Sequence, residues 1–235
     1  MYGCQPVRGR TRRAIRPAVV VAVVASAGLV SPVAAQAQQV TCLNLTPTHI
    51  GTERNDTLVG TNGRDVMIGL GGNDTIRGLD GPDVICGDYG DSSTRPRPGR
   101  DTIYAGPSGA GAFDVDQVRG EERGDWLRGQ EGRDELEGGS GGDEIHGGPG
   151  ADDLNGLEGN DVMYGGPDDD MLRESNPNGG NDRLFGEYGN DQLEGGDHDD
   201  RLDGGPGTNT NDGGDGWDRC INPNRAMGAL NCERP

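Results

Sequence analysis

GGSGGDEIH (residues 138–146), GGPGADDLN (147–155) and GLEGNDVMY (156–164) follow one another without a gap. They share the pattern Gly-Gly-x-Gly-x-Asp-x-apolar-x, in which the third copy has Leu157 at the second place. GLGGNDTIR (69–77) and GEYGNDQLE (186–194) are further clear copies, and the period runs from residue 51 to about residue 221 with two phase breaks. Self-similarity at a fixed short period predicts a repeat architecture.

An aspartate at the sixth place of the repeat is its most constant feature, and one apolar residue follows two places later. The sixth-place aspartates are Asp56, Asp65, Asp74, Asp83, Asp101, Asp116, Asp125, Asp134, Asp143, Asp152, Asp161, Asp170, Asp182, Asp191 and Asp200.

Six glycine-rich residues can reverse the chain, because glycine supplies the positive φ angles that tight turns need. The three residues around the apolar place are expected to form a short strand. Two repeats then return the chain above its start, so that residue i lies over residue i+18 at about 4.8 Å. The pattern therefore predicts an all-β, right-handed parallel β-solenoid, or β-roll, of about sixteen repeats, with the apolar residues inside and the aspartates stacked along two edges.

Stacking by eighteen residues brings carboxylates together in pairs. The predicted pairs are Asp56/Asp74, Asp65/Asp83, Asp83/Asp101, Asp116/Asp134, Asp125/Asp143, Asp134/Asp152, Asp143/Asp161, Asp152/Asp170, Asp182/Asp200 and Asp200/Asp218. Two like charges about 5 Å apart repel by about 1 kcal/mol in water and about 3 kcal/mol at an effective dielectric of 20.

Carboxylate and carbonyl oxygens in an adaptable turn select Ca²⁺ over Zn²⁺ or Cu²⁺, while Mg²⁺ demands a tighter octahedron. Burial of one apolar residue in every nine offsets little of the entropy lost when the backbone is ordered. We therefore expect Ca²⁺ binding to be coupled to folding.

Three stretches depart from the period. Residues 87–104 span two periods but have Ser92 and Thr94 at the sixth and eighth places, so this turn is expected to bind nothing. Extra residues at 105–110 and 174–176 are predicted to be surface loops. Near the C-terminus Asn209 replaces the aspartate, and the next copy has Asp218 with Cys220 in the apolar place, which predicts a terminal cap.

The chain start has the features of a secretory signal. The first 37 residues contain five arginines and no acidic residue, and an apolar stretch at 18–30 is followed by Ala35-Gln36-Ala37. The apolar stretch is too short for a membrane span, which needs about 20 residues. We expect cleavage after Ala37 and a secreted, extracellular protein.

Export gives the cysteines a meaning. After cleavage four remain, and an even number in an oxidising compartment favours two disulfides. Three pairings are possible; we favour Cys42 with Cys86 and Cys220 with Cys232, because each pair flanks one end of the chain. Free thiols or a metal cluster remain the alternative.

The repeats resemble the RTX, or hemolysin-type calcium-binding, nonapeptide repeat over about 170 residues. The resemblance implies a parallel β-roll and Ca²⁺ ligation by the fifteen sixth-place aspartates named above, with Asp218 a less certain member. Thr52, Thr61, Leu70, Leu79 and Leu157 replace the second glycine, and Arg64, Arg100 and Arg133 stand at the fifth place, so some sites are expected to be weak.

These observations predict a signal peptide (1–37), an N-terminal cap segment (38–50), a calcium-binding β-roll (51–221) and a C-terminal cap segment (222–235). The chain has 40 acidic residues against 21 basic ones, which argues against nucleic acid as a partner. We expect a monomeric calcium-binding protein that is not an enzyme. The alternatives are a calcium-dependent surface adhesin or an accessory module for a cell-surface polysaccharide or protein; an enzyme acting on polysaccharide is the least favoured.

Overall fold

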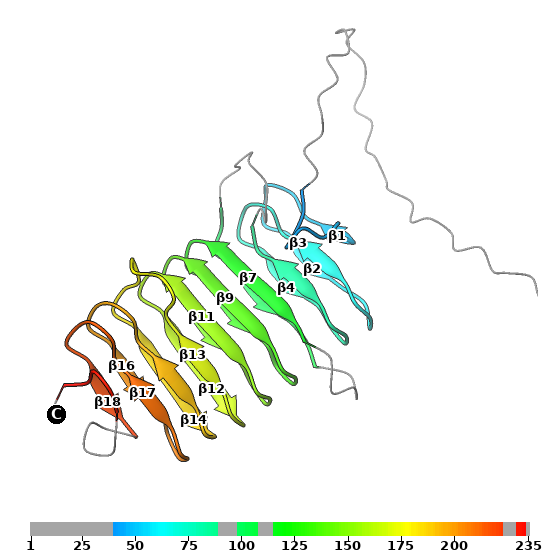
Figure 1. Cartoon of the computed structure of the whole chain (residues 1–235). Helices are drawn as coiled ribbons and strands as arrows, with labels where there is room; N and C mark the ends of the chain where they lie inside the picture. Colours follow the sequence, from blue (N-terminus) through cyan, green and yellow to red (C-terminus); the bar gives the residue numbers. More distant parts are fainter. Residues whose placement is uncertain (1–39, 89–97, 108–114, 223–228, 234–235) are drawn as a thin grey trace, which may run out of the picture. The chain divides into compact units, whose positions relative to one another are not determined.

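Two parallel β-sheets make up the fold. The computed structural model describes residues 40–88, 98–107, 115–222 and 229–233. Within these ranges the odd-numbered strands form one nine-stranded sheet and the even-numbered strands form another, so each turn contributes one strand to each sheet (Figure 1). No helix in the described part of the chain has the length and apolar character needed to cross a bilayer.

The strands are short and follow the repeat. The first sheet contains β1 (His49–Ile50), β3 (Val66–Ile68), β5 (Val84–Cys86), β7 (Gln117–Glu122), β9 (Glu135–Ser140), β11 (Asp153–Glu158), β13 (Met171–Arg173), β15 (Gln192–Glu194) and β17 (Thr210–Asp212). The second contains β2 (Thr57–Val59), β4 (Thr75–Arg77), β6 (Thr102–Tyr104), β8 (Trp126–Arg128), β10 (Glu144–His146), β12 (Val162–Pro167), β14 (Arg183–Tyr188), β16 (Arg201–Asp203) and β18 (Arg219–Ile221).

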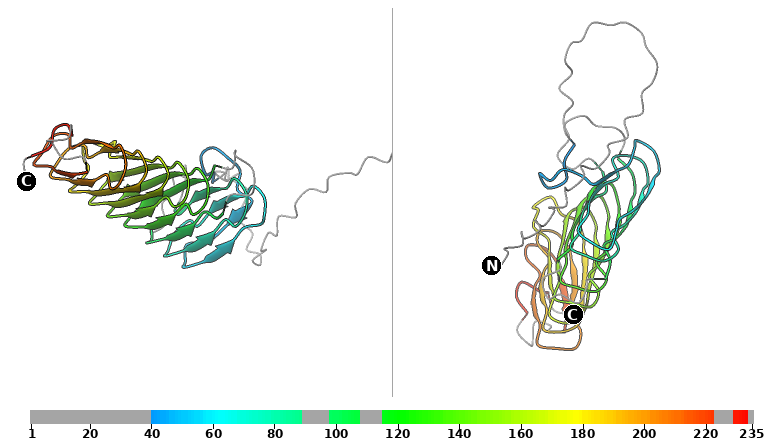
Figure 2. Two further views of the ribbon diagram at one scale, coloured as in Figure 1. Left: turned by 90° about the horizontal axis from the view of Figure 1, so that it is seen from below. Right: turned by 90° about the vertical axis from the view of Figure 1, so that its right-hand side faces the viewer.

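The register confirms stacking by two repeats. In β10, Ile145 pairs with Leu127 on one side and with Met163 on the other, eighteen residues away in each direction. Successive turns therefore lie directly over one another (Figure 2). The described residues form eighteen strands, where about sixteen repeats were predicted, because β1 forms within the predicted N-terminal cap segment and β17 follows Asn209.

The core is a thin ladder between the sheets. The apolar residues at the eighth place, such as Leu136 and Leu154 from one sheet and Ile145 and Met163 from the other, are fully buried or nearly so. Flanking strand residues alternate outward, as expected for strands with one buried face. Most repeats thus contribute one apolar side chain to this core, whereas the repeat that forms β17 has Asn211 at this place.

The first turns have a second, smaller apolar cluster. Val66, Ile68 and Val84 are buried outside the main ladder, and Val40 and Leu43 pack against them. The segment before β1 therefore covers the outer face of β3 and β5, and the Cys42–Cys86 disulfide links it to that face.

The last turn is closed in a similar way. Ala229 and Cys232 are buried in the main core, and Leu230 forms a parallel bridge with Asp212 of β17. The second disulfide joins Cys220 to Cys232. Both disulfides have the pairing that the sequence favoured.

One predicted stacking pair, Asp83/Asp101, is wrong. Strand β6, which follows Asp101, pairs with β4 and β8, so Asp101 stacks between Asp74 and Asp125, and Asp83 stacks on Asp116. The chain from β5 to β6 spans two periods in sequence, but it makes only one step from one sheet to the other, which elsewhere takes one period. An insertion of one full period keeps the phase of the pattern while it omits a strand, which is why counting by nine misplaces the pair. Ser92 and Thr94 lie outside the described residues.

The predicted loop at 105–110 is only partly at the surface. Ala105 is fully buried in the main core, and its N–H donates to the carbonyl of Arg128 at 2.9 Å. The prediction is therefore wrong for Ala105, which continues the β6 ladder by one residue. Residues 108–110 lie outside the described residues.

Candidate metal sites

The sixth-place aspartates form two rows, one along each edge where the turns lead into the strands. In each row, one carboxylate oxygen, Oδ1, accepts the backbone N–H of the sixth-place residue one turn earlier. For example, Asp125 donates to Asp143 at 2.7 Å, and Asp143 donates to Asp161 at 2.7 Å. The described chain contains fourteen such bonds, from 2.6 to 3.3 Å, and the amide oxygen of Asn209 accepts a fifteenth from Asp191 at 2.8 Å. This oxygen therefore holds successive turns together.

The second oxygen, Oδ2, has a different environment. In thirteen of these residues it is buried and accepts no hydrogen bond, although buried polar atoms are almost always paired. The thirteen are Asp74, Asp83, Asp101, Asp125, Asp134, Asp143, Asp152, Asp161, Asp170, Asp182, Asp191, Asp200 and Asp218. These oxygens repeat along both rows and need a positive partner.

Two aspartates in the first turns differ. Oδ2 of Asp56 accepts both the N–H and the hydroxyl of Thr52, at 2.6 and 2.7 Å. Thr61 does the same for Asp65, at 2.6 and 2.9 Å. The threonines that replace the second glycine therefore occupy the oxygen that the other aspartates leave open.

Glycine at the first place makes room for the aspartate. A Cβ on Gly69 would overlap Oδ2 of Asp74, and one on Gly78 would overlap Oδ2 of Asp83. The second place takes a positive φ in many repeats, with or without glycine: φ is 111° at Gly148, 81° at Gln130 and 76° at Leu157. Thr52 and Thr61 are exceptions, since neither has a positive φ.

Burial disfavours the charged form of these carboxyls. It raises the pKa to about 7 for Asp74, Asp83, Asp134, Asp152, Asp161 and Asp170. For Asp125 burial raises the pKa to about 9, and the charges of Asp101 and Asp143 add to the effect. Backbone hydrogen bonds to Oδ1 lower these pKa values but do not cancel the effect of burial. A cation between the turns would remove the penalty, so the donor set fits a bound hard cation.

Two buried acidic residues lie outside the sixth place and were missed from the sequence. Asp88, at the second place of its repeat, is fully buried, and burial raises its pKa to about 8. Its two oxygens accept the backbone N–H groups of Gly99 and Glu122, at 3.2 and 3.3 Å. Through these two hydrogen bonds, Asp88 stabilises the enlarged turn between β5 and β6.

The second missed residue is Glu174, which was predicted to lie in a surface loop. It is 8% exposed, so that prediction is wrong. Its carboxylate lies with those of Asp161 and Asp182, and one oxygen from each falls within 4.8 Å of the others. The signal that could have revealed it is its position: Glu174 follows Gly165 by nine residues and so occupies a first place that glycine takes elsewhere.

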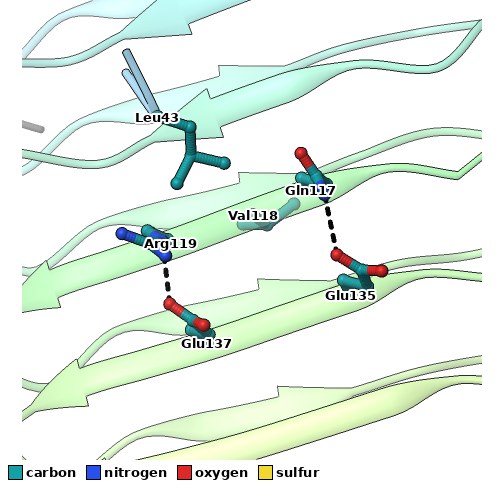
Figure 3. Close-up of a pocket in the computed structure, with 6 residues that line it drawn as sticks. All are labelled: Leu43, Gln117, Val118, Arg119, Glu135 and Glu137. Atoms are coloured by element: carbon teal, nitrogen blue, oxygen red, sulfur yellow. Dashed lines mark hydrogen bonds and ion pairs between the residues drawn. The ribbon is translucent and has the colours of Figure 1, made fainter. Parts of the chain in front are cut away.

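The outer faces of the sheets carry paired polar side chains. In the pocket of Figure 3, Gln117 donates to Glu135 at 2.7 Å, and Arg119 pairs with Glu137 at 2.7 Å. These four side chains of β7 and β9 satisfy one another. Val118 and Leu43 form the apolar lining of this pocket.

Aromatic rings form a ladder on the outside of the even-numbered sheet. His146 stacks on Tyr164 with ring centroids 4.6 Å apart, and Tyr164 stacks on Phe185 at 5.0 Å. Trp126 meets His146 edge to face at 6.4 Å. His146 is half-buried and bonds to Glu144 at 2.8 Å.

The comparison with known families matches this geometry. The sequence profile of the RTX calcium-binding nonapeptide repeat (4 copies) matches residues 50–85, 111–145, 119–154, 146–173 and 177–210, more than half of the chain. The chain belongs to this family. The RTX matches cover most of both rows of stacked aspartates and leave out residues 86–110, which include Asp101 and the enlarged turn, and Asp218 near the C-terminus. No curated protein matches the chain at a significant level of similarity.

Proposed function

We propose that this RTX protein is an exported calcium-binding protein whose solenoid is completed by Ca²⁺ ions between stacked turns. The observation that carries the proposal is the two rows of buried Oδ2 atoms that accept no hydrogen bond. An unsatisfied buried acceptor is costly, and it is most costly when charged. A row of them at regular spacing is best explained by a row of cations.

The ligand type favours calcium. The rows offer carboxylate oxygens, and the turns add backbone carbonyl groups, a set that suits a hard cation with a flexible coordination sphere. Zinc and copper prefer nitrogen and sulfur donors. His49 lies 3.5 Å from Asp65 in the first turn, and the one close group of three candidate ligands in the described residues contains no histidine or cysteine.

We propose the fifteen sixth-place aspartates as the calcium ligands and extend the set to Asp218. Asp218 is fully buried and has the same open Oδ2 as its neighbours. Asp56 and Asp65 are the weakest members, because Thr52 and Thr61 compete with the ion for their second oxygen.

Calcium binding and folding are coupled in this proposal. Most repeats bury one apolar side chain, which offsets little of the entropy lost when the backbone of nine residues is ordered. The raised carboxyl pKa values show that burying the rows without a cation works against the fold at neutral pH. Cations that bind only the folded chain would then drive folding by mass action.

Two features support the extracellular location in this proposal. The predicted signal at 1–37, with cleavage after Ala37, lies outside the described residues, and the two disulfides fit an oxidising compartment. Calcium at millimolar concentration outside the cell would then trigger folding after export.

The side chains on the outer surface give little support to an accessory role in binding polysaccharide. Sugar-binding platforms present aromatic ring faces to the ligand, whereas the faces of His146, Tyr164 and Phe185 lie against one another. We therefore interpret this ladder as a contribution to the stability of the sheet. A calcium-dependent adhesin remains the alternative role, and retention of the protein on cells with and without chelator would test it.

The test of the proposal is far-UV circular dichroism of residues 38–235, which form a compact unit of their own. The chain is placed in chelator and titrated with Ca²⁺ and, separately, with Mg²⁺. We expect a cooperative transition from coil to β-structure in Ca²⁺ alone. Structure that is unchanged by chelator, or a coil that persists in millimolar Ca²⁺, would overturn the proposal.

A further inference from the structure

Among the described acidic residues, only Glu174 replaces a first-place glycine and directs its carboxylate toward a row of stacked aspartates. Its backbone N–H donates to the carbonyl of Glu194 at 3.0 Å, so the main chain continues the ladder at this point. The side chain lies over Gly156, where an added Cβ would overlap both Oε1 of Glu174 and Oδ2 of Asp161. The absence of a side chain at Gly156 therefore creates the space that the glutamate fills.

Neither oxygen of Glu174 has a hydrogen-bond partner of good geometry, and the residue is more than nine-tenths buried. Arg173, the adjacent residue in the chain, pairs instead with Asp153 at 2.9 Å. Burial, together with the charges of Asp182 and Asp161, raises the pKa of Glu174 to about 10, although the N–H of Leu157 acts in the opposite direction. A buried carboxylate aimed at two others is explained by a cation among them or by a proton that keeps it neutral.

The neighbouring aspartates have their own open oxygens. The N–H of Asp161 donates to Oδ1 of Asp182 at 2.7 Å, which leaves Oδ2 of both residues without a partner. Three carboxylates thus offer oxygens within 4.8 Å of one another, whereas the rest of the described chain contains no other group of three acidic, histidine or cysteine side chains this close.

We propose that Asp161, Glu174 and Asp182 form a three-carboxylate Ca²⁺ site that binds more tightly than the sites between two stacked aspartates. This inference rests on the proposed function, since it adds a non-consensus ligand to one level of a row. Calcium affinity rises with the number of charged ligands. The first ion to bind would therefore order the turn between β11 and β12 and the turn between β13 and β14, in the second half of the solenoid.

The test is calcium binding by residues 38–235, measured calorimetrically in competition with a chelator of known affinity. We expect one class of site at least about tenfold tighter than the others in the unmodified chain, and its loss in Glu174→Gln. Glu194→Gln is the matched control, because it removes the same charge from an exposed strand position and should keep the tight site. If Glu174 is instead neutral and structural, glutamine replaces it without effect, and an unchanged tight site in Glu174→Gln would overturn the inference.

Glu174→Gly guards against a folding defect, because glycine is the residue of most other first places. We expect Glu174→Gly to fold in millimolar Ca²⁺, as judged by circular dichroism, and to lack the tight site. If Glu174→Gly keeps the tight site, the inference fails. If the unmodified chain binds no calcium, the proposed function itself fails, so the two failures are distinguishable.

Discussion

Oδ1 of Asp152 accepts the backbone N–H of Asp134 at 2.9 Å, while Oδ2 of the same carboxyl is buried and accepts no hydrogen bond. One atom of the side chain therefore builds the stack, and the other is available to a cation. The two roles can be separated by experiment, because asparagine keeps the first oxygen and loses the charge. Asn209 already does this in the chain: its Oδ1 accepts the N–H of Asp191 at 2.8 Å.

Asp152→Asn should weaken calcium-dependent folding without changing the fold. The ladder bond from Asp134 can persist, but the level loses a charged ligand, which we expect to lower the stability of the calcium-bound state by about 1 to 3 kcal/mol. The calcium midpoint of the circular dichroism transition should move to higher concentration. Glu131→Gln removes an exposed charge and serves as the control. Equal midpoints for the two variants would contradict a ligand role for Asp152.

Acid should favour the fold when calcium is absent. The buried aspartates have folded pKa values raised from the ordinary value of about 4 to between about 6, for Asp101, and about 9, for Asp125. A raised carboxyl pKa means that the folded state binds more protons than the unfolded state. Its stability is therefore greatest below about pH 4 and is lost as the pH rises through the folded values.

The measurement is far-UV circular dichroism of residues 38–235 in chelator, from pH 5 to pH 8. We expect more β-structure at pH 5 than at pH 8, and the difference should vanish in saturating Ca²⁺. A cation-free chain that is more ordered at pH 8 would show that burial of the carboxyl rows is not what opposes folding.

Gly150→Ala should destabilise the solenoid even in saturating calcium. Gly150 has a φ of 140°, and an added Cβ would overlap the carbonyl oxygen of Gly132, which lies in the neighbouring turn of the same stack. We expect a loss of more than about 2 kcal/mol. Gly142→Ala is the control: Gly142 has no positive φ, and the nearest atom to its added Cβ is the carbonyl oxygen of Asn160 at 3.2 Å. Urea unfolding of both variants in saturating calcium would compare them, and similar losses would argue against the steric explanation.

The two disulfides should contribute unequally. Cys42 and Cys86 are 44 residues apart and Cys220 and Cys232 are 12 apart, so loop-closure entropy gives about 4 and about 3 kcal/mol respectively. Paired alanine substitutions at each disulfide, compared by urea unfolding in saturating calcium, should show the larger loss for the first pair. The reverse order would mean that packing around Cys232, and not chain entropy, dominates.

The regular part of this structure could be read from the sequence because one repeat determines its neighbours. An aspartate every nine residues and an apolar residue two places later were enough to predict the parallel sheets, the eighteen-residue register and the rows of carboxylates. The prediction was wrong where the number of repeats in the sequence differs from the number of strands in the solenoid. The insertion between Ile85 and Ile103 equals one period, so a pattern in phase concealed a missing strand.

Departures from the consensus could not be evaluated from the sequence alone. Thr52 and Thr61 replace glycine, but their effect on Asp56 and Asp65 depends on where the hydroxyl lies in the folded turn. Glu174 looked like part of an insertion, because nothing in the chain order indicates that Gly156, eighteen residues earlier, leaves room for its side chain. Such roles arise from contacts between turns.

The covering of the last turn has a consequence for self-association. Leu230 donates its N–H to the carbonyl of Asn211, and Gly213 donates to the carbonyl of Leu230, so the segment at 229–233 takes up hydrogen-bonding groups at the edge of β17. A parallel solenoid without such a segment would end in a template on which the first turn of another copy could add as a further rung. Cys232 ties the segment to β18 through Cys220. A chain that reached calcium with this disulfide reduced would therefore polymerise end to end more readily than the oxidised protein.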